Sequence, residues 1–249
     1  MNTATLAPAP ATATATRTSA RLDLYAPIHK ALRSFMMDTL ARIGRLDVDD
    51  SAEMPATLGQ FDALLQLCES HLRHENEFVH PAIEAREGGR SRRIAGEHRE
   101  HLAHIGALRD EAAGLRQAPD EARRTLLAQR LYRHLALFVA DNFQHMHLEE
   151  TAHNASLWAH YSDGELSALH DRLLASIAPA EMMLVARWMI PALNPAERAG
   201  LVKGLQAGMP PEALAGLLAQ VRPHLDDRGW DKLARAIGVP QQPGLVHVA

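Results

Sequence analysis

Apolar side chains recur every three or four positions along the first two thirds of the chain. Between residues 22 and 46 they fall at Leu24, Ile28, Leu32, Met36, Leu40 and Ile43. This spacing keeps one face of an α-helix apolar. The same pattern returns over residues 55–86, 91–117 and 119–161, and we expect one long amphipathic helix in each range.

Turn-forming residues separate the four ranges. Residues 47–55 and 87–93 predict loops, and the segment Ala118-Pro119-Asp120 predicts a turn in which Pro119 suits the start of a helix. None of the four helices is apolar all round, so each must bury its apolar face against the others. The sequence therefore predicts an all-α fold, with an up-down-up-down four-helix bundle over residues 22–161.

The pattern changes after this range. From residue 162 to residue 249, prolines divide the chain into about five short helical segments, and we expect a C-terminal helical extension. Its methionines, Met182, Met183 and Met189, suit core packing. Residues 1–21 are rich in Ala, Thr and Pro, which predicts a disordered tail; a targeting peptide is the alternative.

Composition and charge exclude several classes of function. The 249 residues carry a formal net charge of −4, which argues against a nucleic-acid partner. No apolar run approaches the ~18 residues that a membrane span needs. The single cysteine, Cys68, cannot form an internal disulfide. We expect a cytoplasmic protein with neither a nucleic-acid nor a membrane partner.

Histidine is the unusual residue type. The chain has 15 histidines, most of them between His29 and His170. Residues three or four apart share a helix face, so each bundle helix aims imidazole or carboxylate at the future core. These inward residues are His29 in the first helix, His71 and Glu75 in the second, His98 and His101 in the third, and His145 and Glu149 in the fourth.

Such a cluster predicts a metal site. Buried carboxylates without partners are costly, and imidazole and carboxylate groups are good ligands for iron, manganese or zinc. A single inward histidine is more often a hydrogen-bonded core residue. Here, however, four helices contribute, and the pairing His-x-x-x-Glu occurs twice, in His71 with Glu75 and in His145 with Glu149.

Four short motifs resemble the hemerythrin-like proteins, also called the HHE cation-binding domain, over residues 22–158. They are Ile28-His29-Lys30, His71-Leu-Arg-His-Glu75 followed by Pro81, Glu97-His98-Arg99, and His145-Met-His-Leu-Glu149-Glu150. The resemblance implies two iron ions, with manganese or zinc as alternatives, bridged by carboxylates and an oxo or hydroxo group. The ligands that it implies are His29, His71, Glu75, His98, His145 and Glu149.

Two ligand positions stay open. Related proteins place the second carboxylate four or five residues after the histidine, and Glu149 and Glu150 occupy both places. The symmetry with Glu75 favours Glu149. Residue 102 is Leu where the oxygen carriers of the family have a histidine, and His101 is the candidate to replace it.

The resemblance also implies a function. We expect a protein that binds dioxygen or a related small ligand such as nitric oxide or peroxide, for sensing or defence, rather than an enzyme. An incomplete ligand set near Leu102 would favour an enzyme acting on peroxide or nitric oxide. A third hypothesis is a helical interaction protein with a structural metal, because ligand binding needs no C-terminal extension; the sequence does not identify a partner for that extension.

Overall fold

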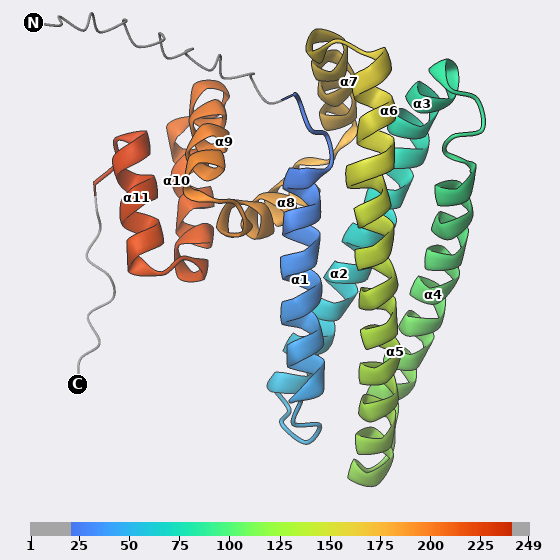
Figure 1. Cartoon of the computed structure of the whole chain (residues 1–249). Coiled ribbons are helices and arrows are strands. Elements are labelled where there is room, and N and C mark those ends of the chain that lie inside the picture. Colours follow the sequence, from blue (N-terminus) through green and yellow to red (C-terminus); the bar gives the residue numbers. More distant parts are fainter. Residues whose placement is uncertain (1–20, 241–249) are drawn as a thin grey trace, which may run out of the picture.

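The computed structural model describes residues 21–240, and every regular element in that range is helical (Figure 1). The expected all-α class is confirmed. The predicted disordered tail, apart from Arg21, and the last residues, 241–249, lie outside the described range.

Four long helical segments form the bundle, and they run alternately up and down (Figure 1). The segments are α1 (Ala26–Gly44); α2 (Glu53–His74), which continues through η1 (Glu75–Val79) into α3 (His80–Arg86); α4 (Arg92–Arg116); and α5 (Glu121–Leu148), which continues through η2 (Glu149–His153) into α6 (Asn154–His160). α1 packs against α2 and α5, and α4 packs against the same two helices. The predicted up-down-up-down bundle is confirmed.

The bundle core consists of the apolar stripes that define the helices. Phe35, Phe61, Leu64, Leu108 and Phe138 are almost completely buried in it. Burial of such side chains stabilises the fold by ~1.5–3 kcal/mol each. The core therefore fixes the rotation of every helix, and with it the direction of the polar residues on the same stripes.

The start of α5 differs from the prediction by two residues. The helix begins at Glu121, and the Asp120 side chain caps it by accepting a hydrogen bond from the backbone N–H of Arg123 at 2.8 Å. Pro119 thus precedes the cap, because an Asp side chain satisfies a free N–H group of the first turn.

The elements η1 and η2 are single π turns inside the second and fourth segments. Each begins at the Glu of a His-x-x-x-Glu pair. Pro81 follows the first turn and has no N–H to donate to the carbonyl four residues earlier. In the second turn, Thr151 donates its hydroxyl to the carbonyl of His147 at 2.7 Å. Both π turns shift the register of the residues that follow them.

The C-terminal extension is helical, as predicted, and has its own apolar core. It comprises α7 (Asp163–Ser176), α8 (Pro179–Ala192), α9 (Pro195–Gly208), α10 (Pro211–Val221), the 3₁₀ turn η3 (Arg222–His224) and α11 (Asp227–Ile237). Ile190, Val202, Val221 and Trp230 are buried together in this second core. Within residues 21–240 no single helix has the length and hydropathy for a membrane span, although α7 and α8, bent by 118°, pass as a pair.

One helix joins the two cores. α8 packs along α1, where Trp188 stacks on Phe35 with ring centroids 4.2 Å apart. Val185 on α8 belongs to the bundle core, whereas Ala186 and Ile190 belong to the second core. The extension is therefore attached to the bundle through the contact of α8 with α1, the helix that carries His29.

Candidate metal centre

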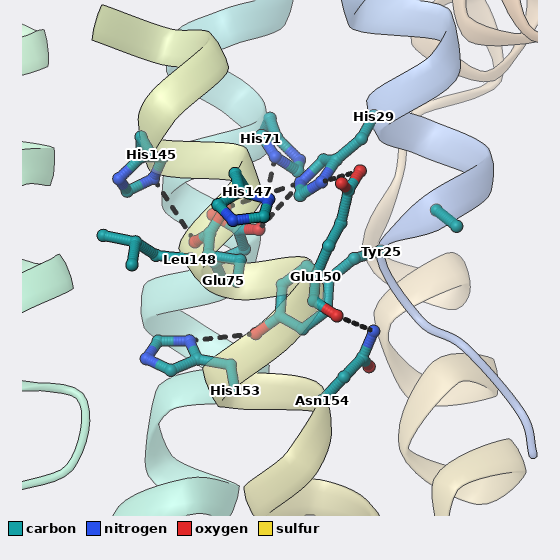
Figure 2. Close-up of polar contacts among 12 residues, drawn as sticks. Tyr25, His29, His71, Glu75, His145, His147, Leu148, Glu150, His153 and Asn154 are labelled. Carbon is teal, nitrogen blue, oxygen red and sulfur yellow. Dashed lines mark hydrogen bonds and ion pairs between the residues drawn. The ribbon is translucent and has the colours of Figure 1, made fainter.

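Six predicted site residues meet at one level of the bundle. They are His29 on α1, His71 on α2, Glu75 in the first π turn, His98 on α4, His145 on α5 and Glu149 in the second π turn. Their side chains are buried, with His71 the most exposed at 11%. Figure 2 shows His29, His71 and Glu75 facing one another, with His145 beside them.

These residues form two groups that share both carboxylates. The first group is His29, His71, Glu75 and Glu149, and the second is His98, His145, Glu75 and Glu149. Within each group the ligand atoms lie within 4.8 Å of one another. Each group offers two imidazole nitrogens and two carboxylate oxygens, a set that suits iron, manganese or zinc.

The carboxylates turn one oxygen to each group. Glu75 Oε1 lies 3.2 Å from His71 Nε2, and its Oε2 lies 3.4 Å from His98 Nε2. Glu149 Oε2 lies 3.5 Å from His29 Nε2, and its Oε1 lies 3.3 Å from His145 Nε2. A carboxylate in this position can bridge two cations, and the bundle provides two such carboxylates on opposite helices.

The inner atoms of the centre lack conventional partners. Both oxygens of Glu75, both oxygens of Glu149 and the Nε2 atoms of His29 and His71 are buried without a hydrogen-bond partner among residues 21–240. Leaving a buried acceptor unsatisfied costs ~1–3 kcal/mol, and more for a charged group. Six unpartnered atoms in one place fit a pair of cations.

The outer ring nitrogens, in contrast, are anchored. The Nδ1 atoms of three histidines bond to oxygens behind them: His29 to Glu150 at 3.1 Å, His98 to Asn76 at 2.9 Å, and His145 to Glu97 at 3.0 Å. Such a bond places the proton on Nδ1 and directs the lone pair of Nε2 inward. This is the usual arrangement of a metal-ligating histidine.

Burial and mutual contacts shift the pKa values of the residues in the two groups. Burial lowers the pKa of His71 to about 4. Burial also acts to lower the pKa of His29 and His145, but the carboxylates beside them, Glu150 and Glu149 respectively, help to raise both values to about 9. The imidazoles around Glu75 hold its pKa well below the usual range despite its burial. The carboxylates are therefore ionised at neutral pH, as cation binding requires.

The remaining predicted residues lie outside the two groups. His101 is buried, with its ring centroid 4.8 Å from that of His145, but its nitrogens reach neither group. Leu102 is 39% exposed. Glu150 bonds to Arg33 at 2.5 Å and to His29, so Glu149 is the carboxylate that lies in the groups.

Sequence reasoning missed His80 and His153 as site residues. Both are buried and form a third group with Glu149. The four-residue spacing of His153 from Glu149 was a signal for its position. His80 follows Glu75 by five residues, and only a π turn brings that spacing onto the same face. The hydroxyl of Tyr25 bonds to Nδ1 of His153 at 3.2 Å.

Comparison with known proteins agrees with this geometry. No curated protein and no solved structure matches the chain. The family model described as the hemerythrin HHE cation binding domain matches residues 22–152, which is more than half of the chain. That range includes the first three bundle segments, the fourth as far as the second π turn, and both four-residue groups. The chain is a cation-binding protein and belongs to the hemerythrin family of HHE cation-binding domains.

Proposed function

We propose that the two groups hold a pair of iron ions and that the protein uses this pair to bind dioxygen, nitric oxide or peroxide. The observation that carries the proposal is the position of Glu75 and Glu149, each with one oxygen toward either group. When bound, iron supplies a redox-active centre with exchangeable coordination positions. The chain supplies the ligands and their orientation.

Burial determines how the chain's residues act on a small ligand. His29, His98, Glu75 and Glu149 have side-chain exposures of 3% or less. Little water competes at such a site, so charges and dipoles act strongly on whatever binds there. The anchored imidazoles need no rearrangement, because Glu150, Asn76 and Glu97 already hold them in place.

Optical spectroscopy tests the proposal. The full chain is loaded anaerobically with ferrous iron and then exposed to dioxygen or nitric oxide. We expect near-ultraviolet bands of a bridged ferric pair after oxidation, and their loss in His71→Ala. His147→Ala is the matched control, because His147 is an exposed histidine on the fourth segment and lies outside both groups. An unchanged spectrum in wild type would refute ligand binding at iron.

A second candidate function is catalysis on peroxide or nitric oxide. It is favoured by the small ligand set of each group, two histidines and two carboxylates, since His101 joins neither group and Leu102 is exposed. Fewer protein ligands leave more coordination positions open for a reactant. Iron-dependent consumption of hydrogen peroxide that disappears in His98→Ala supports this candidate. A stable complex without turnover excludes it.

The attachment of the extension supports a sensing role. α1 carries His29 and packs against α8, and Lys30 on α1 pairs with Glu197 on α9 at 2.7 Å. A shift of α1 on ligand binding would thus also move α8 and α9 in the extension. A carrier needs no such connection, so we favour a sensor over a carrier, and over an interaction protein whose metal is only structural.

A further inference from the structure

A third cluster of ligand-type residues lies beside the two groups. It consists of His80, Glu149 and His153, whose ligand atoms lie within 4.8 Å of one another. The exposures of these residues are 5%, 0% and 2%. Only Glu149 is common to this cluster and the others. His80 follows the first π turn and His153 ends the second, so both π turns contribute to the cluster.

The inner nitrogens of the cluster are free to bind. His80 Nε2 and His153 Nε2 are buried and have no hydrogen-bond partner in the described part of the chain. Most buried polar side-chain atoms in proteins have a partner. The two atoms therefore resemble the unpartnered Nε2 atoms of His29 and His71, which face the first group.

The outer side of His153 is anchored like that of a ligand. Its Nδ1 lies 3.2 Å from the hydroxyl of Tyr25, and Figure 2 shows the two side chains joined at the edge of the site. This repeats the arrangement of His29, His98 and His145, in which Nδ1 is held and Nε2 points inward. His101 shows the contrast, because its Nδ1 has no partner within residues 21–240 and it joins no group.

Ring packing fixes His80 in the same place. Its imidazole stacks on that of His98, with ring centroids 4.8 Å apart, and meets His153 edge-on at 5.5 Å. His80 is thus held between one ligand of the second group and the other histidine of the cluster. These ring contacts hold the buried His80 side chain in one position.

Negative charge surrounds the cluster. Besides Glu75 and Glu149, two further carboxylates lie directly behind the imidazoles: Glu97 at His145 and Glu150 at His29. Arg93 and Arg33 offset part of that charge from the outside. Carboxylates near a site favour cation binding through the Coulomb interaction, most strongly where water is excluded.

We propose that His80, Glu149 and His153 form a third cation position, for a divalent transition-metal ion, next to the pair. Two histidines and one carboxylate bind such ions and leave coordination positions open. The position binds more weakly than the pair, because its only carboxylate is shared. The inference rests on the proposed function to the extent that Glu149 belongs to both sites.

Metal counting tests the inference without any activity assay. The full chain is dialysed to equilibrium against excess cobalt(II), and bound cobalt per chain is measured by elemental analysis. We expect three cobalt ions in wild type and two in His153→Ala and His80→Ala. His147→Ala, six residues from His153 and exposed, should keep all three. Circular dichroism checks that each variant remains helical.

The outcomes separate this inference from the proposed function. Two cobalt ions in wild type would overturn the third position and leave the pair intact. Fewer than two would refute the pair itself. Three ions in wild type and still three in both variants would place the third ion elsewhere, and a fall to one in His153→Ala would make His153 a ligand of the pair; either result overturns the inference.

Discussion

At the scale of single residues, the centre depends on two carboxylates that oppose each other. Burial and the charge of Glu75 act to raise the pKa of Glu149, but the neighbouring imidazoles of His145 and His98 hold it below its usual value. All four carboxylate oxygens lack hydrogen-bond partners in the described range. The fold thus holds two like charges together at a free-energy cost, which cations between them would offset.

Substitution by glutamine should distinguish the role of Glu149 in metal binding from that of its neighbour Glu150. Glu149→Gln removes a carboxylate that both groups share, so metal affinity should fall by more than the ~10–100-fold typical of losing an outer partner. Glu150→Gln should stay within that range, because Glu150 contacts only the outer nitrogen of His29 and Arg33. Competition with a chelator measures both affinities. Equal losses in the two variants would contradict the assignment.

The raised pKa values of His29 and His145 predict opposite pH effects on the metal-free and metal-loaded protein. A histidine whose pKa rises from 6.5 to about 9 on folding stabilises the metal-free fold below pH 6.5. That contribution is lost as the pH rises through 9. Metal ions must displace these protons, so metal affinity increases over the same window.

Thermal unfolding measures this effect directly. Between pH 6.5 and 9, the Tm of the metal-free chain should fall because His29 and His145 lose their protons. The increase in Tm caused by added zinc should grow over that window. If the increase in Tm caused by zinc became smaller toward pH 9, the raised pKa values of His29 and His145 would be contradicted.

The sequence predicted those site residues that are spaced as in an ordinary α-helix. His71 with Glu75 and His145 with Glu149 stand four residues apart, so the α-helical pattern placed them together. His80 stands five residues after Glu75, so the α-helical pattern did not bring it to the site. Partners of the outer nitrogens, such as Asn76 and Glu97, could not be predicted, because they depend on the rotation of packed helices.

At the scale of elements, the π turns matter most to the site. An α-helix brings residues four apart onto one face, whereas a π turn brings residues five apart together. The first π turn therefore carries both Glu75 and His80, five residues apart, toward the centre. The second π turn contains both Glu149 and His153, which are four residues apart and also face the centre. Single π turns are frequent at functional sites, and here both occur at the carboxylates.

The end of α8 is another element whose stability depends on one residue. Arg198 is buried and donates to the carbonyls of Ile190, Pro191 and Leu193 at 2.8–3.0 Å. Arg198→Met would leave these three acceptors without their donor, so the free energy of unfolding should fall by ~2–4 kcal/mol. Urea denaturation measures the change.

An exposed arginine provides the control for this prediction. Arg235→Met removes an exposed guanidinium whose one hydrogen bond within residues 21–240 is to the backbone carbonyl of Asp231 in its own helix. It should change the free energy of unfolding by less than ~0.5 kcal/mol. A similar small effect for Arg198→Met would show that the carbonyls at the end of α8 find other donors.

At the scale of the whole molecule, the sequence predicted two helical regions but not their connection. Proline spacing divided the extension into short helices, since proline lacks the N–H that a helix interior needs. The sharing of α8 between two cores, and the stacking of Trp188 on Phe35, arise from tertiary packing that a local pattern does not encode. That connection makes the extension a candidate for the output of a sensor.

Hydrogen exchange tests the connection. Loading with metal should slow amide exchange in α1 and in both π turns, because the bound ions would tie their side chains together. The effect should extend to α8, which packs on α1, and be smaller in α11. Trp188→Ala should remove the effect in α8 and preserve it in α1. Identical exchange in α8 with and without metal would argue against sensing through this helix.

The most direct test of the central claim is the iron content of the purified full chain. After anaerobic reconstitution with ferrous iron and gel filtration in metal-free buffer, the weaker third position is expected to empty. Wild type should then retain two iron ions per chain, and Glu75→Gln should retain fewer than one, because both groups share that carboxylate. Wild type with less than one transition-metal ion per chain would contradict the account.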